Sequence, residues 1–176
     1  PIIRVKEISK SYKLPAKIFN KPEIIYAVKQ VSFDVKIGET LAIVGESGSG
    51  KSTIAKIING LINKDEGHIE IKGQKIDNIS VSDRAKLIQP VFQDPYSTLN
   101  PVHTIGYIVS RPLTITENKS ESEIKEEVIK TLRLVGLSKE YYNRFPNQLS
   151  GGQRQRVAIA RAIILLSLIH ISEPTR

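Results

Sequence analysis

The sequence of 176 residues contains no cysteine, no methionine and no tryptophan, and only 6% of its residues are aromatic. The lack of cysteine excludes disulfides, thiolate catalysis and zinc sites built on thiolates. No apolar run approaches the ~20 residues of a membrane-spanning helix, and the N-terminus lacks the basic and apolar segments of a signal peptide. We therefore expect a soluble, cytosolic chain. Because there is no initiator methionine, we also expect the chain to begin inside a longer protein.

The composition is otherwise that of an ordinary globular protein, with 40% hydrophobic and 25% charged residues. These values exclude long disordered, collagen-like and coiled-coil sequences. The net charge of +8 (26 − 18) admits a nucleic acid or an anionic surface as a partner. The lysines and arginines are spread along the chain, however, which is more typical of solvated faces.

The first half of the chain is rich in strand patterns. Alternating apolar residues predict half-buried antiparallel strands at 3–5 and 31–35, with a turn at 37–39. A second alternation predicts an exposed strand over 67–73. The segment 14–25 contains two prolines and is expected to be a surface loop.

Three further segments surround a glycine-rich stretch. The short apolar run 40–44 ends in glycine and predicts a buried parallel strand. Residues 52–59 predict a helix that Gly60 closes. The run 87–92 is a strand candidate that Pro90 interrupts.

The second half, residues 104–165, is predicted to be mostly helical. An i, i+4 stripe of apolar residues carries this prediction (Ile124, Val128, Leu132, Val135). Ser120 and Glu123 have the spacing of a capping box, and Gly136 is placed to close the same helix. The two halves together suggest an α/β core with an appended helical lobe.

The strongest motif is a complete phosphate loop between the predicted strand and the predicted helix (Gly45, Glu46, Ser47, Gly48, Ser49, Gly50, Lys51, Ser52). Its glycines let the backbone curl so that successive N–H groups form an anion site at a helix N-terminus. Lys51 is placed for the β and γ phosphates, Ser52 for Mg²⁺ and Thr53 for the α phosphate. The alternative is a flexible Gly/Ser loop before an ordinary helix. The motif predicts nucleoside triphosphate binding.

A second candidate anion site lies at Leu149-Ser150-Gly151-Gly152-Gln153, before a predicted helix that runs to Leu165. A hydroxyl, two glycines and an amide at a helix start direct N–H groups outward. Taken alone, the segment is also typical of a linker. Two anion sites this far apart in sequence require either a long-range closure or two copies of the chain to hold one nucleotide.

The sequence resembles the ATP-binding subunits of ATP-binding cassette (ABC) transporters, because GESGSGKST and LSGGQRQR occur in the family's order. Gln93 matches the family's Q-loop glutamine, and Tyr12 matches the aromatic residue that stacks on adenine, although it can also be a packing residue. The resemblance covers Ile2 to about Leu165. FQDPYSTLNP and the proline-containing loop are similar to the oligopeptide and dipeptide importer subgroup, which has nickel and oligosaccharide relatives.

The resemblance implies a P-loop NTPase fold: a RecA-like core with an antiparallel β subdomain, plus a helical subdomain, incomplete at the C-terminus. It implies ATP and Mg²⁺ as cofactors, Lys51 and Gln93 in catalysis, and Ser52 and Gln93 at the metal. Nucleotide held by the phosphate loop, Thr53 and Tyr12 of one copy would be capped by the second motif of another copy (Ser150, Gly151, Gly152, Gln153).

The implied partners are a second ATPase subunit, transmembrane permease subunits and, indirectly, an extracytoplasmic substrate-binding protein, with no nucleic acid. The implied location is the cytoplasmic face of the cell membrane. Two rival hypotheses remain: a soluble ABC-type ATPase that acts on DNA or the ribosome, and a catalytically dead regulatory paralogue.

The expected division is a core lobe at 1–92, a Q-loop and helical subdomain at 93–150, a signature helix at 151–165 and a tail at 166–176. The family's strand ending in Asp-Glu and its switch histidine should follow the signature helix, but the tail contains Ser-Glu-Pro-Thr instead. The tail also matches, residue for residue, the translation of a sequencing-library adapter. We therefore expect it to be non-native.

Overall fold

The computed structural model describes residues 1–14, 23–91 and 98–172, and for Val81 and residues 166–172 it describes the backbone only. The chain folds into two compact units, residues 1–88 and 89–176. No helix in the described ranges combines the length and apolar character needed to cross a bilayer. The finer division at residues 92, 150 and 165 stays a prediction.

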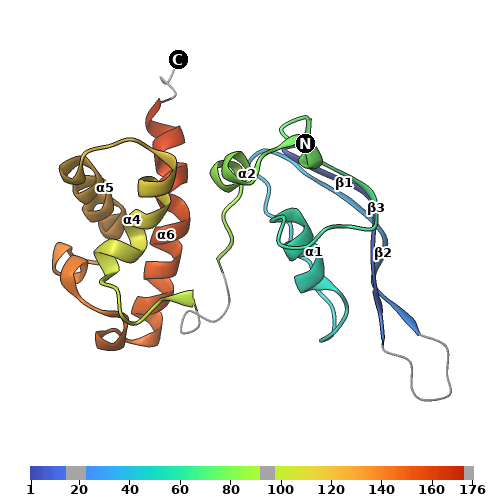
Figure 1. Cartoon of the computed structure of the whole chain (residues 1–176), viewed down its shortest axis with the longest axis horizontal. Helices are drawn as coiled ribbons and strands as arrows, with labels where there is room; N and C mark the ends of the chain where they lie inside the picture. Colours follow the sequence, from blue (N-terminus) through green and yellow to red (C-terminus); the bar gives the residue numbers. More distant parts are fainter. Residues whose placement is uncertain (15–22, 92–97, 173–176) are drawn as a thin grey trace. The chain divides into compact units, whose positions relative to one another are not determined.

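The first unit is built on an antiparallel sheet of four strands in the order β2-β1-β3-β4 (Figure 1). The strands are β1 (Ile3–Lys13), β2 (Ile24–Val35), β3 (Glu66–Ile71) and β4 (Gln74–Lys75). The predicted strands at 3–5 and 31–35 are confirmed, because Val5 pairs with Phe33 in antiparallel register. Lys72 and Gly73, with φ of 50° and 78°, make the two-residue turn between β3 and β4.

Helix α1 (Lys51–Ile58) lies beside this sheet (Figure 1) and shares its core through Ile54 and Ile57. The short helices η1 (Ile76–Asn78) and α2 (Val81–Leu87) come after β4 in the chain. The predicted helix with its closing glycine is confirmed, since Gly60 follows α1 at φ 74°. The core of the unit is formed by buried aliphatic side chains of the sheet and helices (Val5, Ile8, Val28, Ile54, Ile57, Ile69, Ile71, Ile76, Ile79).

Four expectations for this half of the chain were wrong. Residues 40–44 form no strand, and Val44 is 88% exposed, because no described strand pairs with this segment. The described part of 87–92 is also not a strand, since α2 ends at Leu87. The strand at 67–73 buries Ile69 and Ile71 against α1 instead of being exposed. The predicted loop at 14–25 extends too far, because β2 already begins at Ile24.

The second unit is a helical bundle, as predicted. It contains α4 (Ile105–Thr116), α5 (Glu121–Leu134), η2 (Lys139–Asn143), η3 (Pro146–Gln148) and α6 (Gly151–Ser172). The predicted capping box of α5 is present, with Ser120 and Glu123 exchanging hydrogen bonds. Gly136 follows α5 at φ 75° and ends that helix.

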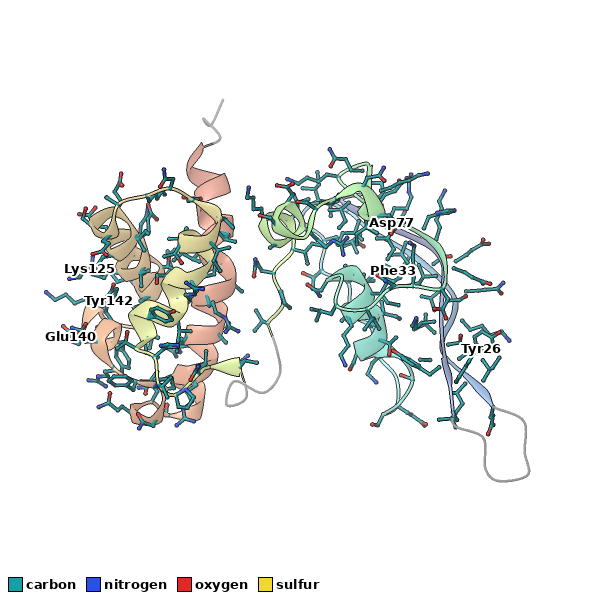
Figure 2. All side chains as sticks on the ribbon, in the orientation of Figure 1. Tyr26, Phe33, Asp77, Lys125, Glu140 and Tyr142 are labelled. Carbon is teal, nitrogen blue, oxygen red and sulfur yellow. The ribbon has the colours of Figure 1, made fainter. Side chains whose placement is uncertain are left out.

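The apolar stripe of α5, from which the helix was predicted, packs into the core of the helical bundle. Helix α6 packs against α4 and α5 (Figure 1), and the core is formed by apolar side chains of all three helices and the intervening turns (Leu99, Ile105, Ile108, Val109, Leu113, Val128, Leu132, Leu137, Leu149, Val157, Ala160, Ile164, Leu165). Figure 2 shows Tyr142 of η2 beside Lys125 of α5, and the ammonium lies 5.6 Å from the ring centre. The helix continues seven residues beyond the predicted end at Leu165. That residues 166–176 are adapter-derived stays a prediction.

Candidate nucleotide-binding site

The phosphate loop leads directly into α1, and its backbone has the conformation that only glycine adopts readily. Gly48 and Gly50 have φ of 85° and 93°, in the left-handed region. A Cβ atom on Gly50 would lie 2.1 Å from the carbonyl oxygen of Ala27 in β2. The first turn of α1 therefore sits close against β2, and only a glycine at this position allows that approach.

Lys51, the first residue of α1, folds its side chain back over the loop. Its Nζ donates hydrogen bonds to the carbonyl oxygens of Gly45 (2.8 Å) and Glu46 (2.6 Å) and to the Oγ of Ser49 (3.3 Å). An ammonium group has three N–H donors, so the loop engages all of them. The loop thus holds the positive charge of Lys51 beside its own glycine-rich backbone. The bond to Ser49 is the longest of the three.

The remaining loop and first-turn residues lie at the surface. Glu46, Ser47 and Ser52 are exposed, and Thr53 is partly buried. No group of three or more acidic or histidine side chains in the described ranges is placed to hold a metal. Mg²⁺ in nucleotide sites takes one or two protein oxygens together with phosphate oxygens and water, and the exposed Ser52 hydroxyl at the helix start fits that role.

Tyr12 lies near the end of β1 and is 45% exposed. It pairs with Ile25, two residues before Ala27. Gly50 of the phosphate loop lies against the carbonyl oxygen of Ala27, so the loop ends beside the part of β2 that pairs with Tyr12. The half-exposed ring is thus in the neighbourhood of the loop and accessible to a flat ligand.

Asp65, which the sequence did not single out, holds β1 next to Tyr12. Its carboxylate accepts hydrogen bonds from the Nζ of Lys10, from the backbone N–H of Ser11 (2.7 Å) and from the Ser11 hydroxyl (2.8 Å). These donors, Lys10 first and Ser11 next, lower the pKa of Asp65 to about 2. Pairing of β1 with β3 ends at Ser9, and the hydrogen bonds of Asp65 hold the next two residues of β1.

The second motif lies at the start of α6, in the helical unit. The side chains of Ser150 and Gln153 form a capping box: the N–H of Ser150 donates to Gln153 Oε1 (2.9 Å), and the N–H of Gln153 donates to Ser150 Oγ (3.3 Å). Ser150 and Gly152 are exposed, and a Cβ on Gly152 would meet no atom within 4 Å. The first turn therefore presents its backbone to open space.

A cavity of about 310 Å³ adjoins this helix start (Gly136, Leu137, Tyr141, Ser150, Gly152, Gln153, Arg156). Tyr141 is a site neighbour that the motif did not indicate, whereas Arg156 is the last residue of the quoted LSGGQRQR segment. The serine-to-glutamine spacing of three residues is the sequence signal that predicts the capping box. Gln93, predicted for the Q-loop, lies outside the described residues.

A glycine-rich loop that enters a helix, with a lysine folded over it, defines a nucleotide-binding domain of the P-loop class. The sequence model of the ABC transporter family matches residues 28–175, and the chain belongs to this family. The family's fold is a P-loop NTPase cassette, of which this chain contains the antiparallel sheet, the phosphate loop and the helical unit.

Relatives and solved structures agree with this assignment. The chain is 40% identical over 168 residues to the dipeptide transport ATP-binding protein DppF of Haemophilus influenzae, covering 94% of this chain and 51% of that protein. It is 42% identical over 171 residues to the oligopeptide transport ATP-binding protein OppF of the same organism, covering 93% and 52%. The dimeric ATP-binding cassette MJ0796, solved with ADP and Pi, superposes with a TM-score of 0.79 at 36% identity, covering 93% of this chain and 70% of that one.

The chain spans about half the length of these curated relatives. Its match to each of them nevertheless includes nearly all of its own residues.

Proposed function

We propose that this chain is part of the ATP-binding subunit of an ABC importer for peptides, and that the longer protein hydrolyses ATP to drive import. The phosphate loop with the ammonium of Lys51 fixed over it is the observation that supports nucleotide binding. The dipeptide and oligopeptide transport proteins among the relatives support peptides as the transported class.

In this proposal the residues of the chain divide the work of holding ATP. The loop N–H groups and Lys51 bind the phosphates, and Thr53 contributes at the α phosphate. Tyr12 stacks on the adenine. When Mg²⁺ is bound, it neutralises phosphate charge, and the hydroxyl of Ser52 would hold it together with Gln93.

A second cassette subunit completes the site. In the first turn of α6, Ser150 and Gly152 are exposed on either side of the partly buried Gly151. The positive end of the helix dipole at this N-terminus suits the phosphates of ATP bound to the other copy. MJ0796 is a dimer in its structure with ADP and Pi. Closure of two copies on ATP would act on permease subunits at the cytoplasmic face of the membrane, with a substrate-binding protein as an indirect partner.

The rival is an ABC-type ATPase that acts on DNA or the ribosome. Its supporting observation is the net charge of +8. Salt-sensitive binding of RNA or DNA by the full-length protein, together with no effect of its deletion on peptide uptake, would favour this rival.

The test is Lys51→Ala in the full-length protein, with Lys56→Ala as the matched control. Both changes remove one lysine from α1, but only Lys51 contacts the loop. We expect Lys51→Ala to reduce ATP turnover and peptide uptake at least tenfold, which corresponds to ~1.4 kcal/mol. Unchanged turnover in Lys51→Ala would exclude the nucleotide-binding role, and intact turnover without peptide uptake would exclude the substrate class.

A further inference from the structure

Tyr141 connects the turn η2 to the first turn of α6. Its hydroxyl accepts a hydrogen bond of 2.8 Å from the Nε2 of Gln153. Both residues are partly buried and line the cavity of about 310 Å³ beside the helix start. The amide of Gln153 is therefore held from outside its own helix.

The oxygen and the nitrogen of the Gln153 amide have different hydrogen-bond partners. Its Oε1 accepts the N–H of Ser150 in the capping box, while its Nε2 donates to Tyr141. An amide side chain fixed at both ends has one orientation, and that orientation keeps its oxygen on Ser150. Tyr141 thus selects the amide orientation that closes the cap.

Tyr141 is itself firmly placed. The guanidinium of Arg144 lies 4.4 Å from the centre of the tyrosine ring, within the range of a cation–π contact. The ring also packs against the buried core of the helical bundle. The hydroxyl therefore projects from a supported ring and not from a mobile side chain.

We propose that Tyr141 is a positioning residue for the phosphate-capping end of α6. This inference rests on the proposed function, in which the first turn of α6 caps ATP bound to a second subunit. Without the hydroxyl, Gln153 loses a partner, the capping box weakens, and the first turn frays. Tyr141 acts through Gln153, so its loss should impair association of the two ATP-loaded subunits while leaving nucleotide binding to one subunit intact.

The experiment compares Tyr141→Phe with Tyr142→Phe in the full-length protein. Both remove one phenol hydroxyl from η2, but the Tyr142 ring packs on Gly106 and Lys125, away from Gln153. Nucleotide binding is measured by titration at protein concentrations that keep the protein monomeric, and association by sedimentation with a slowly hydrolysed ATP analogue. We expect Tyr141→Phe to weaken association about threefold to tenfold, with monomer binding unchanged, and Tyr142→Phe to change neither.

Two measurements separate positioning from general destabilisation. In a Gln153→Ala background, Tyr141→Phe should have no further effect on association, because the pathway through the amide is already broken. Amide hydrogen exchange in the first turn of α6 should accelerate in Tyr141→Phe, while exchange in the middle of α5 stays as in the parent.

The outcomes are distinguishable. If the parent protein binds no ATP, or if two parent subunits do not associate in the presence of ATP, both the proposed function and this inference are overturned. Normal ATP-dependent association of the parent and equally strong association of Tyr141→Phe overturn the inference alone. Additive losses in the Gln153→Ala background also overturn it, since Tyr141 would then act by another route.

Discussion

The carboxylate of Asp65 illustrates how one residue organises the edge of the candidate site. It lies in the turn before β3 and accepts three hydrogen bonds from Lys10 and Ser11, the two residues that precede Tyr12. β3 no longer pairs with β1 at this point, so the side chain replaces a strand partner. An ionised aspartate therefore supports β1 immediately before Tyr12.

Asp65→Asn should make the stability of the protein depend less on pH. The folded-state pKa of about 2 lies below the ordinary value of 3.8. The carboxylate consequently stabilises the fold at pH above about 4, and this contribution is lost as the pH falls through about 2. The side chain is 36% exposed, so solvent screening limits the effect to about 0.5–1 kcal/mol at pH 7.

Urea unfolding of parent and variant between pH 7 and pH 2.5 checks this prediction. Asp34→Asn serves as the control, since its contact with Arg4 is longer, at 3.6 Å, and more exposed. The difference between parent and Asp65→Asn should shrink toward low pH. A difference that is constant over the whole range would show that the ionised form of Asp65 contributes nothing.

At the scale of helices and strands, the elements that the sequence predicts correctly are those stabilised by contacts between residues close together in the chain. The Ser120–Glu123 capping box and the stripe on α5 depend on residues three and four apart, and both form as expected. The Ser150–Gln153 pair has the same spacing and also forms a capping box, at the same helix start for which the motif predicts phosphate binding. The contact with Tyr141 was not predictable, because it depends on how η2 folds back on α6.

The close packing of α4 on η2 gives a prediction for Gly106. A Cβ atom there would lie 2.6 Å from the ring of Tyr142, which is packed between α4 and Lys125 of α5. Gly106→Ala should therefore lower the free energy of unfolding by about 1–2 kcal/mol, since the overlap outweighs the better helix propensity of alanine. Thermal unfolding of the full-length protein measures the loss.

Gly152→Ala is the matched control, because it places the same methyl group on a helix where no atom lies within 4 Å. This variant should unfold at the parental temperature or slightly above it. Equal unfolding temperatures for Gly106→Ala and the parent would mean that the Tyr142 ring moves aside without cost.

At the scale of the whole molecule, the segment 40–44 is the clearest departure from expectation. Its apolar pattern predicts a buried parallel strand, yet Leu41, Ile43 and Val44 are exposed by 41%, 43% and 88%. A parallel strand gains its stability from neighbours that are distant in sequence. No such neighbour exists among the described strands of the first unit, and the dipeptide and oligopeptide transport relatives are about twice as long as this chain.

We therefore expect the segment 40–44 to be paired in the longer protein. In the full-length protein its amide protons should exchange at least tenfold more slowly than in the 176-residue chain, because strand pairing would protect them. The amides of β1 that pair with β2 are the internal control and should be protected in both proteins, since that pairing is already complete. Hydrogen exchange read by mass spectrometry on peptides covering 38–46 and 3–13 makes the comparison. Fast exchange of 40–44 in both proteins would show that the apolar run before the phosphate loop is not a strand in the cassette, and that the loop is held by α1 and β2 alone.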